Sequence, residues 1–526
     1  MTRLRRIVPI VLAGAVAGAA CGLSPASRDA VKAQQGAVIT GPSGAVPAPA
    51  GDVGTGDTGT GDTGTGSTGT GTTPTTAATD AALPVTGGGG GGVAPVGGGG
   101  GTTAAPGQPT TGPRATASAG STAPSGKASA AGGPCSTDGG NSTGVTKTTL
   151  NIGAHAPLTG TGTPFPNTSF QVGSKIYWQA AGHTVCGRKV SVDFRDDTYT
   201  PSGARAVCEP ESRQDFLVIG LAGTDQIQSC ATDPVLDGSG TPYLSGGVTT
   251  NGLTGLPNYF PVSLTYQQQG PLVVKAAQAN GYATPAKVDS GHQWAIVTAN
   301  TKNFDDATQG ITAALDAAGI TYKVLRVDQS GNYDAAATSQ GQSLALKGYH
   351  TIFVDTAPGY FVFMTAGYYK QNPVGDAIWT GPGITFTELT VAQLACTATG
   401  SLINNKAYFL APGPGLDHAT PDFIAAAKAA NNGKYDDIMW SLWGLSQSIY
   451  QMLTKTSAAG PLTRQSFIKN LSGSTIPNGI YSPLDYRSSH FGGTGAWLQR
   501  MTCSQNEPGQ SQPGTWVTVG SSPYVL

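Results

Sequence analysis

The stretch Leu150-Asn-Ile-Gly-Ala-His-Ala-Pro-Leu-Thr-Gly160 decides the fold, because it joins a short apolar run to a turn. Residues 150–154 predict a buried strand, and Pro157 to Gly160 supply the residue types that end one. A helix is expected at 170–181, where apolar residues recur at helical spacing. The globular part of the chain therefore opens with a strand, a turn and a helix.

The same unit recurs along the chain. Apolar strands are expected at 190–194, 216–220, 240–244, 294–298, 322–327 and 351–355. Helices are expected from Pro201 onward and at 230–236, 306–318 and 335–347. Short apolar strands that alternate with helices indicate an α/β fold with parallel sheets. A Gln/Gly/Pro stretch near 267–271 separates two such series, and about 380 residues exceed what one core serves, so two lobes are expected.

The N-terminal residues predict export. Arg3, Arg5 and Arg6 precede an apolar run at 7–17, and small residues follow, which is typical of a signal peptide at 1–20. Cys21 comes directly after Gly-Ala-Ala, which resembles a bacterial lipobox, although Gly18 stands where leucine is usual. The resemblance implies that Cys21 is lipidated and that it anchors the chain to the outer face of the membrane.

Residues 21–144 are rich in Gly, Thr, Ser and Pro and contain glycine runs at 87–92 and 97–101. A segment with so few large apolar side chains cannot bury enough surface to fold. We expect it to be a disordered tether that precedes a globular domain at 145–526.

Charge and motifs exclude several classes of function. The chain has 29 basic and 30 acidic residues, and this near-neutral balance argues against nucleic acid as a partner. The six histidines are scattered singly, and no hydrolase or zinc-protease motif is present, so no enzyme, metal or cofactor is expected. Asp196 and Asp197 form a carboxylate pair, but adjacent residues at a strand end point to opposite sides, which favours a turn.

The cysteines agree with export. Six remain after Cys21, and an even number in an exported chain predicts disulfides, although six cysteines allow fifteen connectivities. Cys208 with Cys230 is the first choice, because they stand at the ends of one helix–strand–helix unit. Cys135–Cys186 and Cys396–Cys503 follow by proximity.

Five segments together resemble the type I periplasmic-binding proteins, and most closely the leucine/isoleucine/valine-binding group, which are solute receptors of ABC importers. In order, they are residues 152–160, 190–197, 218–226, 240–247 and 269–271. The resemblance implies two lobes joined by three crossovers, each lobe a parallel sheet flanked by helices. Lobe 1 is expected at about 145–268 and 408–490, where helices at 438–454 and 463–471 return to it. Lobe 2 is expected at about 269–407 and 491–526.

The resemblance also implies a ligand site in the cleft between the lobes. Two turns of lobe 1 hold the ligand's carboxylate in this family, which carries that role to Thr224 and to Gly247 and Thr249. A free helix N-terminus attracts a carboxylate, although a threonine there is also a common helix cap. Phe165 and Phe304 fall where the family places aromatic walls, and either ring could instead pack within a lobe.

One departure bears on the ligand. Where the family has a glutamate for the ligand's ammonium, this chain reads Trp379-Thr-Gly-Pro-Gly383-Ile-Thr385, and Ala357 stands at a position that is often aromatic. The acids that could substitute are Asp225, Asp305, Asp355 and Glu388, each of which also fits a cap or a solvated charge. Asp225 and Thr385 join the candidate contacts.

The expected function is capture of a small polar solute and its delivery to an ABC permease in the membrane. An amino acid, an amide or another carboxylate-bearing solute fits, and a branched-chain amino acid is not assumed. Two alternatives remain open. The chain could be a ligand sensor for a membrane signalling protein, or a non-binding module associated with the cell wall.

Overall fold

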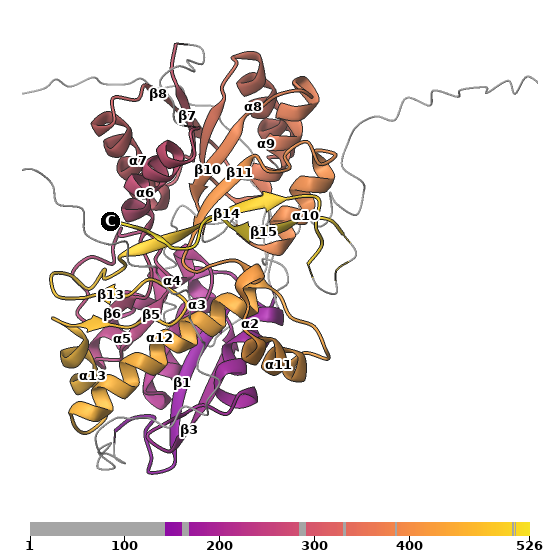
Figure 1. Ribbon diagram of the computed structural model, residues 1–526. Helices are drawn as coiled ribbons and strands as arrows, with labels where there is room; N and C mark the ends of the chain where they lie inside the picture. The colour runs from indigo at the N-terminus through magenta and orange to yellow at the C-terminus, as the bar shows by residue number, and fades with distance from the viewer. Residues whose placement is uncertain are drawn as a thin grey trace, which may run out of the picture. The chain divides into compact units, whose positions relative to one another are not determined.

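The computed structural model describes residues 142–159, 168–282, 291–329, 333–383, 387–507, 510 and 512–526 (Figure 1). These residues form two α/β lobes, each built on its own sheet. Within these ranges, no helix combines the length and the apolar character needed to cross a bilayer. Cys21, Cys135, Phe165 and Thr385 lie outside the described residues.

Lobe 1 contains a six-stranded sheet in the order β2-β3-β1-β4-β5-β6, parallel except where β2 meets β3. Its strands are β1 (Thr149–Ala156), β2 (Thr184–Val185), β3 (Arg188–Asp196), β4 (Leu217–Gly220), β5 (Tyr243–Ser245) and β6 (Tyr259–Pro261). Its helices are α2 (Thr168–Lys175), the π-helical turn η1 (Ile176–Ala180), α3 (Pro201–Gln214), α4 (Thr224–Ala231), α5 (Pro234–Gly238), α11 (Pro421–Ala430), α12 (Asp437–Ala459) and α13 (Arg464–Leu471). A small antiparallel pair, β12 (Thr475–Ile476) with β13 (Leu484–Asp485), follows α13.

Lobe 2 contains a sheet in the order β15-β14-β11-β10-β9-β7-β8, and β16 pairs with β14. Its strands are β7 (Trp294–Ala299), β8 (Tyr322–Val327), β9 (Thr351–Asp355), β10 (Ile378–Pro382), β11 (Ala407–Ala411), β14 (Gly495–Thr502), β15 (Thr515–Thr518) and β16 (Tyr524–Val525). Its helices are α6 (Tyr266–Ala279), α7 (Asp305–Ala317), α8 (Asp334–Leu346), α9 (Pro358–Gln371) and α10 (Leu389–Ala398). Short 3-10 turns are η2 (Lys302–Phe304) and η3 (Leu416–His418).

Helices cover both faces of each sheet. Successive strand residues point to opposite sides, so neighbouring residues of one strand belong to different cores. In lobe 1, Ile152 and Ile219 belong to the core under α2 and α12, whereas Val218 belongs to the core under α3 and α4. In lobe 2, Val297 faces the α8–α9 side and Ile296 faces the α6–α7 side. Figure 1 shows α12 running along one side of the β1 sheet.

Three crossovers join the lobes, which confirms that expectation. The chain leaves lobe 1 after β6, returns after β11 and leaves again after β13. The Gln/Gly/Pro stretch at 267–271 lies inside α6, the first helix of lobe 2, and therefore between the two series of strands as expected. Thr265 starts that helix by accepting the Gln268 N–H in a capping box, so the crossover ends in a helix at once. The predicted boundary at 407/408 falls within β11, so the return follows Ala411.

Two of the predicted disulfides are present. Cys208–Cys230 joins α3 to α4, and Cys396–Cys503 joins α10 to the residue after β14. Cys186 is also disulfide-bonded. Because Cys135 lies outside the described residues, its pairing with Cys186 stays a prediction.

Candidate functional site

A cavity of about 240 Å³ lies where the carboxyl ends of the strands of the two sheets meet. Lobe 1 lines it with the residues after β3, β4, β5 and β6 and with the first turns of α12. Lobe 2 lines it with the residues after β7, β9, β10 and β11. Ligands of α/β proteins bind outside the carboxyl ends of parallel strands, so this cavity is the candidate binding site.

The first wall is the start of α4. β4 ends at Gly220, and Gly223 has a φ of +82°, which turns the chain into the helix. Thr224 and Asp225, both predicted contacts, line the cavity. The Thr224 hydroxyl lies 3.0 Å from the hydroxyl of Tyr266 at the start of α6. Asp225 accepts a hydrogen bond from the Asn303 side chain of lobe 2, so this wall also joins the lobes.

The second predicted turn has a different role. The Gly247 N–H donates to the Ser263 hydroxyl at 2.7 Å, and Thr249 is fully buried and accepts the Asn251 N–H. Gly246 and Val248 line the cavity, but Gly247 and Thr249 do not. Both predicted residues therefore lie behind the wall. The next residue, Thr250, donates its N–H to Asp306 of lobe 2 at 2.6 Å, so this turn also links the lobes.

An aromatic wall comes from both lobes. Phe304, a predicted wall residue, lines the cavity and lies parallel to the ring of Tyr266, with centroids 6.4 Å apart. Tyr199, which the sequence reading did not single out, also lines it. The other predicted aromatic, Phe165, and the predicted contact Thr385 are outside the described residues.

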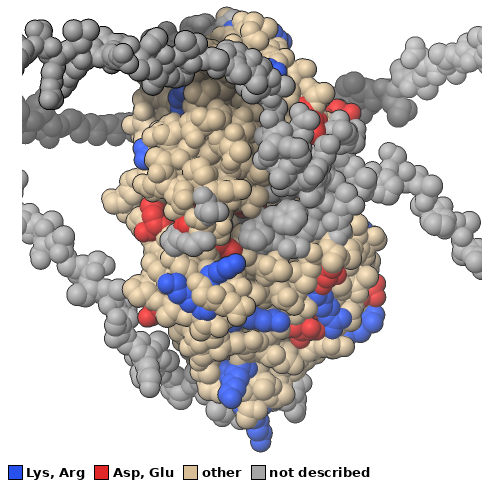
Figure 2. All heavy atoms as spheres, turned by 90° about the vertical axis from the view of Figure 1, so that its right-hand side faces the viewer, with Lys and Arg blue, Asp and Glu red and all other residues tan. Residues whose placement is uncertain are grey.

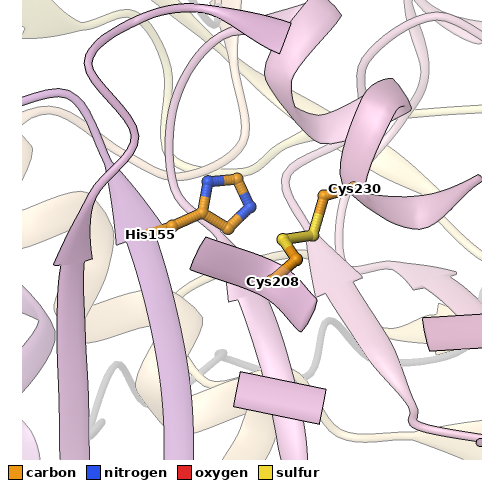
Figure 3. Close-up of side chains that lie close together, drawn as sticks. All are labelled: His155, Cys208 and Cys230. Atoms are coloured by element: carbon orange, nitrogen blue, oxygen red, sulfur yellow. A yellow bond between two sulfur atoms is a disulfide. The ribbon is translucent and has the colours of Figure 1, made fainter. Parts of the chain in front are cut away.

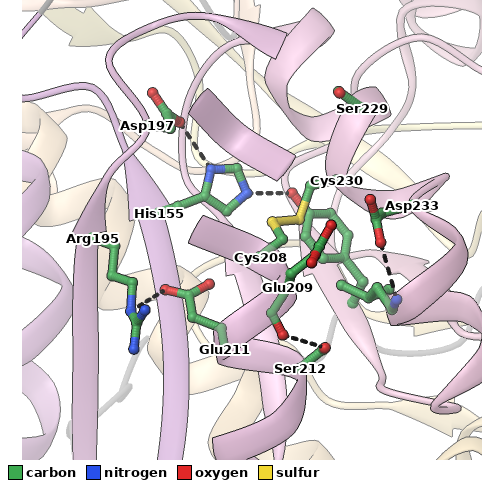
Figure 4. Close-up of a disulfide and its surroundings, with 12 residues drawn as sticks. His155, Arg195, Asp197, Cys208, Glu209, Glu211, Ser212, Ser229, Cys230 and Asp233 are labelled. Carbon is green, nitrogen blue, oxygen red and sulfur yellow. Dashed lines mark hydrogen bonds and ion pairs between the residues drawn. A yellow bond between two sulfur atoms is a disulfide. The ribbon is translucent and has the colours of Figure 1, made fainter. Parts of the chain in front are cut away.

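A chain of hydrogen bonds holds Tyr199 in place, and Figure 4 shows the buried pair His155 and Asp197 that belongs to it. Its φ of 54° is unusual for a residue with a side chain, and the Asp197 carboxylate stabilises this turn by accepting the Tyr199 N–H at 2.9 Å. His155 contacts the same carboxylate through Nδ1 at 2.9 Å and the Tyr243 hydroxyl through Nε2 at 2.7 Å. Asp196 accepts the Thr198 N–H, so the prediction that the carboxylate pair makes a turn is confirmed. Neither His155, Asp197 nor Tyr243 reaches the cavity.

One group of side chains in the described residues has the spacing of a metal site (Figure 3). A ring nitrogen of His155 and the sulfurs of Cys208 and Cys230 lie within 4.8 Å of one another. The two sulfurs are bonded to each other, and a metal would require thiolates. The arrangement is therefore the packing of a disulfide against a buried histidine.

The acid that the family has on lobe 2 is absent at Gly383 in this chain. Gly383 has no room for a side chain, because a Cβ there would lie 2.0 Å from the Leu410 carbonyl oxygen of β11. Glu388 lines the cavity instead. It precedes α10 but makes no capping hydrogen bond, and it is half-buried, so it is neither the cap nor the solvated charge that were its alternatives. Asp305 pairs with Arg326, and Asp355 is buried behind the wall.

The environment of the cavity disfavours charge on its acids. Burial, with a contribution from Asp436, raises the pKa of Glu388 to about 8. Asp437, at the start of α12, also lines the cavity, and burial together with Glu507 and Asp436 holds its pKa well above the usual range. Burial raises the pKa of Asp225 as well, although the hydrogen bond from Asn303 opposes this.

Sequence reasoning missed the contribution of α12. Asp437, Ile438, Leu442 and Leu445 line the cavity from its first turns. Their helical spacing is typical of an ordinary core helix. It does not reveal that the N-terminal part of the apolar face of α12 lines a cavity. The Asp436-Asp437 pair just before an apolar run was the available clue.

One face of the molecule carries few charges (Figure 2). Figure 2 shows a face on which most described atoms belong to uncharged residues, and basic side chains over the lower lobe have acidic ones beside them.

Comparisons with known proteins agree with this architecture. Residues 149–507 match a family model described as periplasmic binding protein. A fatty acid ABC transporter substrate-binding protein from Thermomonospora curvata has 16% identity and a TM-score of 0.57, covering 73% of this chain and 94% of its own. A solute-binding protein of an ABC transporter from R. palustris, in complex with 4-hydroxybenzoate, has 16% identity and a TM-score of 0.54, covering 72% and 97%.

A branched-chain amino acid transporter substrate-binding protein from Streptococcus pneumoniae, in complex with isoleucine, has 14% identity and a TM-score of 0.51, covering 70% of this chain and all of its own. No curated protein sequence matches significantly. At such identities the solved structures show a shared fold, while the family match spans most of the chain. The chain belongs to the periplasmic binding protein family.

Proposed function

We propose that the chain is an extracytoplasmic lipoprotein of the leucine/isoleucine/valine-binding branch that captures a small polar solute and delivers it to an ABC importer. An amino acid, an amide or another carboxylate-bearing solute was the expectation from the sequence. The observation that carries the proposal is the cavity of about 240 Å³ between the strand ends of the two lobes. Lipidation of Cys21 would hold the receptor at the membrane that contains its permease.

Hydrogen bonds across the cleft support a receptor that closes. Thr250, in the turn after β5, bonds to Asp306, and Asp225, at the start of α4, bonds to Asn303, so both bonds join the two lobes. A ligand that touches both walls favours the closed state, because it gains contacts there that the open state lacks. The cavity also weighs against the non-binding module. The sensor alternative uses the same cleft and differs only in the membrane partner.

A thermal-shift screen of the purified protein tests the proposal. The panel should contain amino acids, organic acids, amides, amines and sugars. A solute at 100 times its dissociation constant adds about 2.7 kcal/mol to the free energy of unfolding, which raises the melting temperature measurably. At least one solute should do so.

A cavity-filling variant provides the control. Ser441 lies on the cavity-lining side of α12, so Ser441→Phe should abolish the shift caused by any such solute. Ser202→Phe, at an exposed position of α3, should keep it. A flat screen with folded protein, or a solute that binds equally to both variants, would contradict the proposed function.

A further inference from the structure

The cavity has an unbalanced set of charges. Three carboxyl side chains line it, those of Asp225, Glu388 and Asp437, and no basic side chain does so among the described residues. Among the described residues, a carboxylate-bearing ligand would therefore find no cation in the cavity wall.

Two of the acids line the cavity from opposite lobes. Glu388 comes from lobe 2, and its carboxyl group has no hydrogen-bond or ion-pair partner among the described residues. Asp437 comes from lobe 1 and accepts the N–H of Leu389, the residue next to Glu388. Burial is the main cause of the raised pKa of Asp437, and Glu388 is among the neighbouring acids that add to the cost of ionising it.

The groups that could bind an anion in lobe 1 either lie beside a carboxyl group or already make a hydrogen bond. Asp225 stands in the first turn of α4, where its charge opposes that of an incoming carboxylate. The Thr224 hydroxyl already contacts Tyr266, and the Gly247 N–H is already donated to Ser263.

The remaining wall suits a cation with an apolar body. Tyr199, Tyr266 and Phe304 present aromatic rings to the cavity, and aromatic faces attract ammonium groups. Leu442 and Leu445 of α12 supply apolar surface beside Asp437. A volume of about 240 Å³ is below the usual range of about 300–1,000 Å³ for drug-sized ligands, so the occupant is small.

We propose that the ligand is a small organic amine without a carboxylate, whose ammonium group lies between Glu388 of lobe 2 and Asp437 of lobe 1. The proposal rests on the proposed function, since it names the class of solute that the same cavity takes. It also explains how binding would close the cleft. An ammonium between the two acids would favour their ionised forms and contact both of them, and only the closed state can offer both contacts.

Matched sets of probes test the charge of the ligand. One set is 2-phenylethylamine, phenylalanine and 3-phenylpropionate, and the other is isopentylamine, leucine and 4-methylpentanoate. Within each set the apolar body is the same, while the polar end is an amine, a zwitterion or a carboxylate. Binding to the full protein is measured by calorimetry and by the shift in melting temperature.

We expect at least one of the two amines to bind at least about tenfold more tightly than the acid and the amino acid of its set, because an unpaired ligand carboxylate loses its hydration in the cavity. If an amino acid or a carboxylate binds as tightly as its amine, or if only other solutes of the wider screen bind, the amine proposal is overturned and the proposed function stands. If no solute of any class binds, both fail.

Substitution of the acids locates the ammonium. Glu388→Gln keeps the size of the side chain and should weaken amine binding by about tenfold or more. Asp316→Asn removes an exposed acid of α7 outside the cavity lining and should leave it unchanged. If Glu388→Gln does not fold, as judged by its unfolding curve, Asp437→Asn serves as the second variant. Unchanged amine affinity in a folded variant of either acid would overturn the placement.

Discussion

Arg464, the first residue of α13, donates hydrogen bonds to four backbone carbonyl groups of other segments. Its guanidinium donates to Phe216 at 3.1 Å, to Ser212 at 2.5 Å, to Ser239 at 3.4 Å and to Asp215. These carbonyls lie where α3 and α5 end and where β4 begins. One side chain therefore fixes the return of the C-terminal helices onto the first lobe.

Replacing this residue should destabilise the protein strongly. We expect Arg464→Met to lower the free energy of unfolding by about 2–4 kcal/mol, because carbonyls bonded to a charged donor lose their partner. Urea unfolding followed by circular dichroism measures the change. Arg213→Met is the matched control, since Arg213 is exposed and pairs only loosely with Glu209 at 3.5 Å, so its effect should stay within about 0.5 kcal/mol. Equal losses in the two variants would contradict this role.

At the scale of elements, α8 and α9 pack closely enough for their backbones to meet. A Cβ at Gly341 of α8 would lie 1.9 Å from the Met364 carbonyl oxygen, and one at Gly367 of α9 would lie 2.2 Å from that of Thr338. Each helix thus presents a glycine to the main chain of the other. The close approach is possible only because these positions have no side chain.

A single methyl group should disturb this helix pair. We expect Gly341→Ala to cost about 1–3 kcal/mol of unfolding free energy, since the helices must move apart. Gly238→Ala in α5 tests the substitution itself, because nothing lies within 4 Å of a Cβ built there. The control should be neutral or slightly stabilising, as alanine favours helices. Urea midpoints of both variants decide the matter, and an unaffected Gly341→Ala protein would show that the helices can separate without cost.

Elements with a strong local pattern were predictable from the sequence. The strand at 351–355 coincides with β9, and the helix at 306–318 differs from α7 by one residue at each end. The apolar pattern gave no strand after Asp355, where β10 contains Gly381 and Pro382 and where β14 and β15 are antiparallel additions. Parallel pairing does not depend on local sequence, so the order of the strands within each sheet was not predicted.

The predicted strand ends indicated only part of the cavity wall. Thr224, Asp225 and Phe304 stand just after predicted strands, and all three line the cavity. Gly247 does not line the cavity, and its N–H is donated to Ser263, a residue that follows another strand. Glu388 could not be chosen over Gly383 without knowing that the β11 backbone fills the space beside Gly383.

At the scale of the whole molecule, most of the carboxyl groups whose pKa is shifted have a raised pKa. Burial raises the pKa of Asp215 to about 7, that of Glu388 to about 8 and that of Glu507 to about 7. In the unfolded chain these groups would titrate near 3.8 for aspartate and 4.5 for glutamate. The folded protein therefore holds their protons more tightly than the unfolded chain does. Their stabilisation is complete below about pH 4 and is lost as the pH rises through 7 to 8.

The protein should therefore be more stable in mild acid than in mild base. We expect the melting temperature to fall as the pH is raised from 5 to 8.5. Glu507→Gln should make this dependence shallower, since it removes one titrating group while keeping an acceptor for Thr515. Asp485→Asn should leave it unchanged, because Arg487 lowers the pKa of Asp485 to about 2, outside this range. A melting temperature that rises over the same interval would contradict the assignment.

The third crossover has a practical consequence. Gly144 packs against Phe216 of lobe 1, whereas β16 pairs with β14 of lobe 2, so the two ends of the described chain belong to different lobes. Thr143 and Ser522 are both exposed and lie close to these ends. A donor fluorophore on one and an acceptor on the other would report the separation of the lobes through energy transfer. Under the proposed function, such a labelled protein would report ligand binding by fluorescence with no insertion into either lobe.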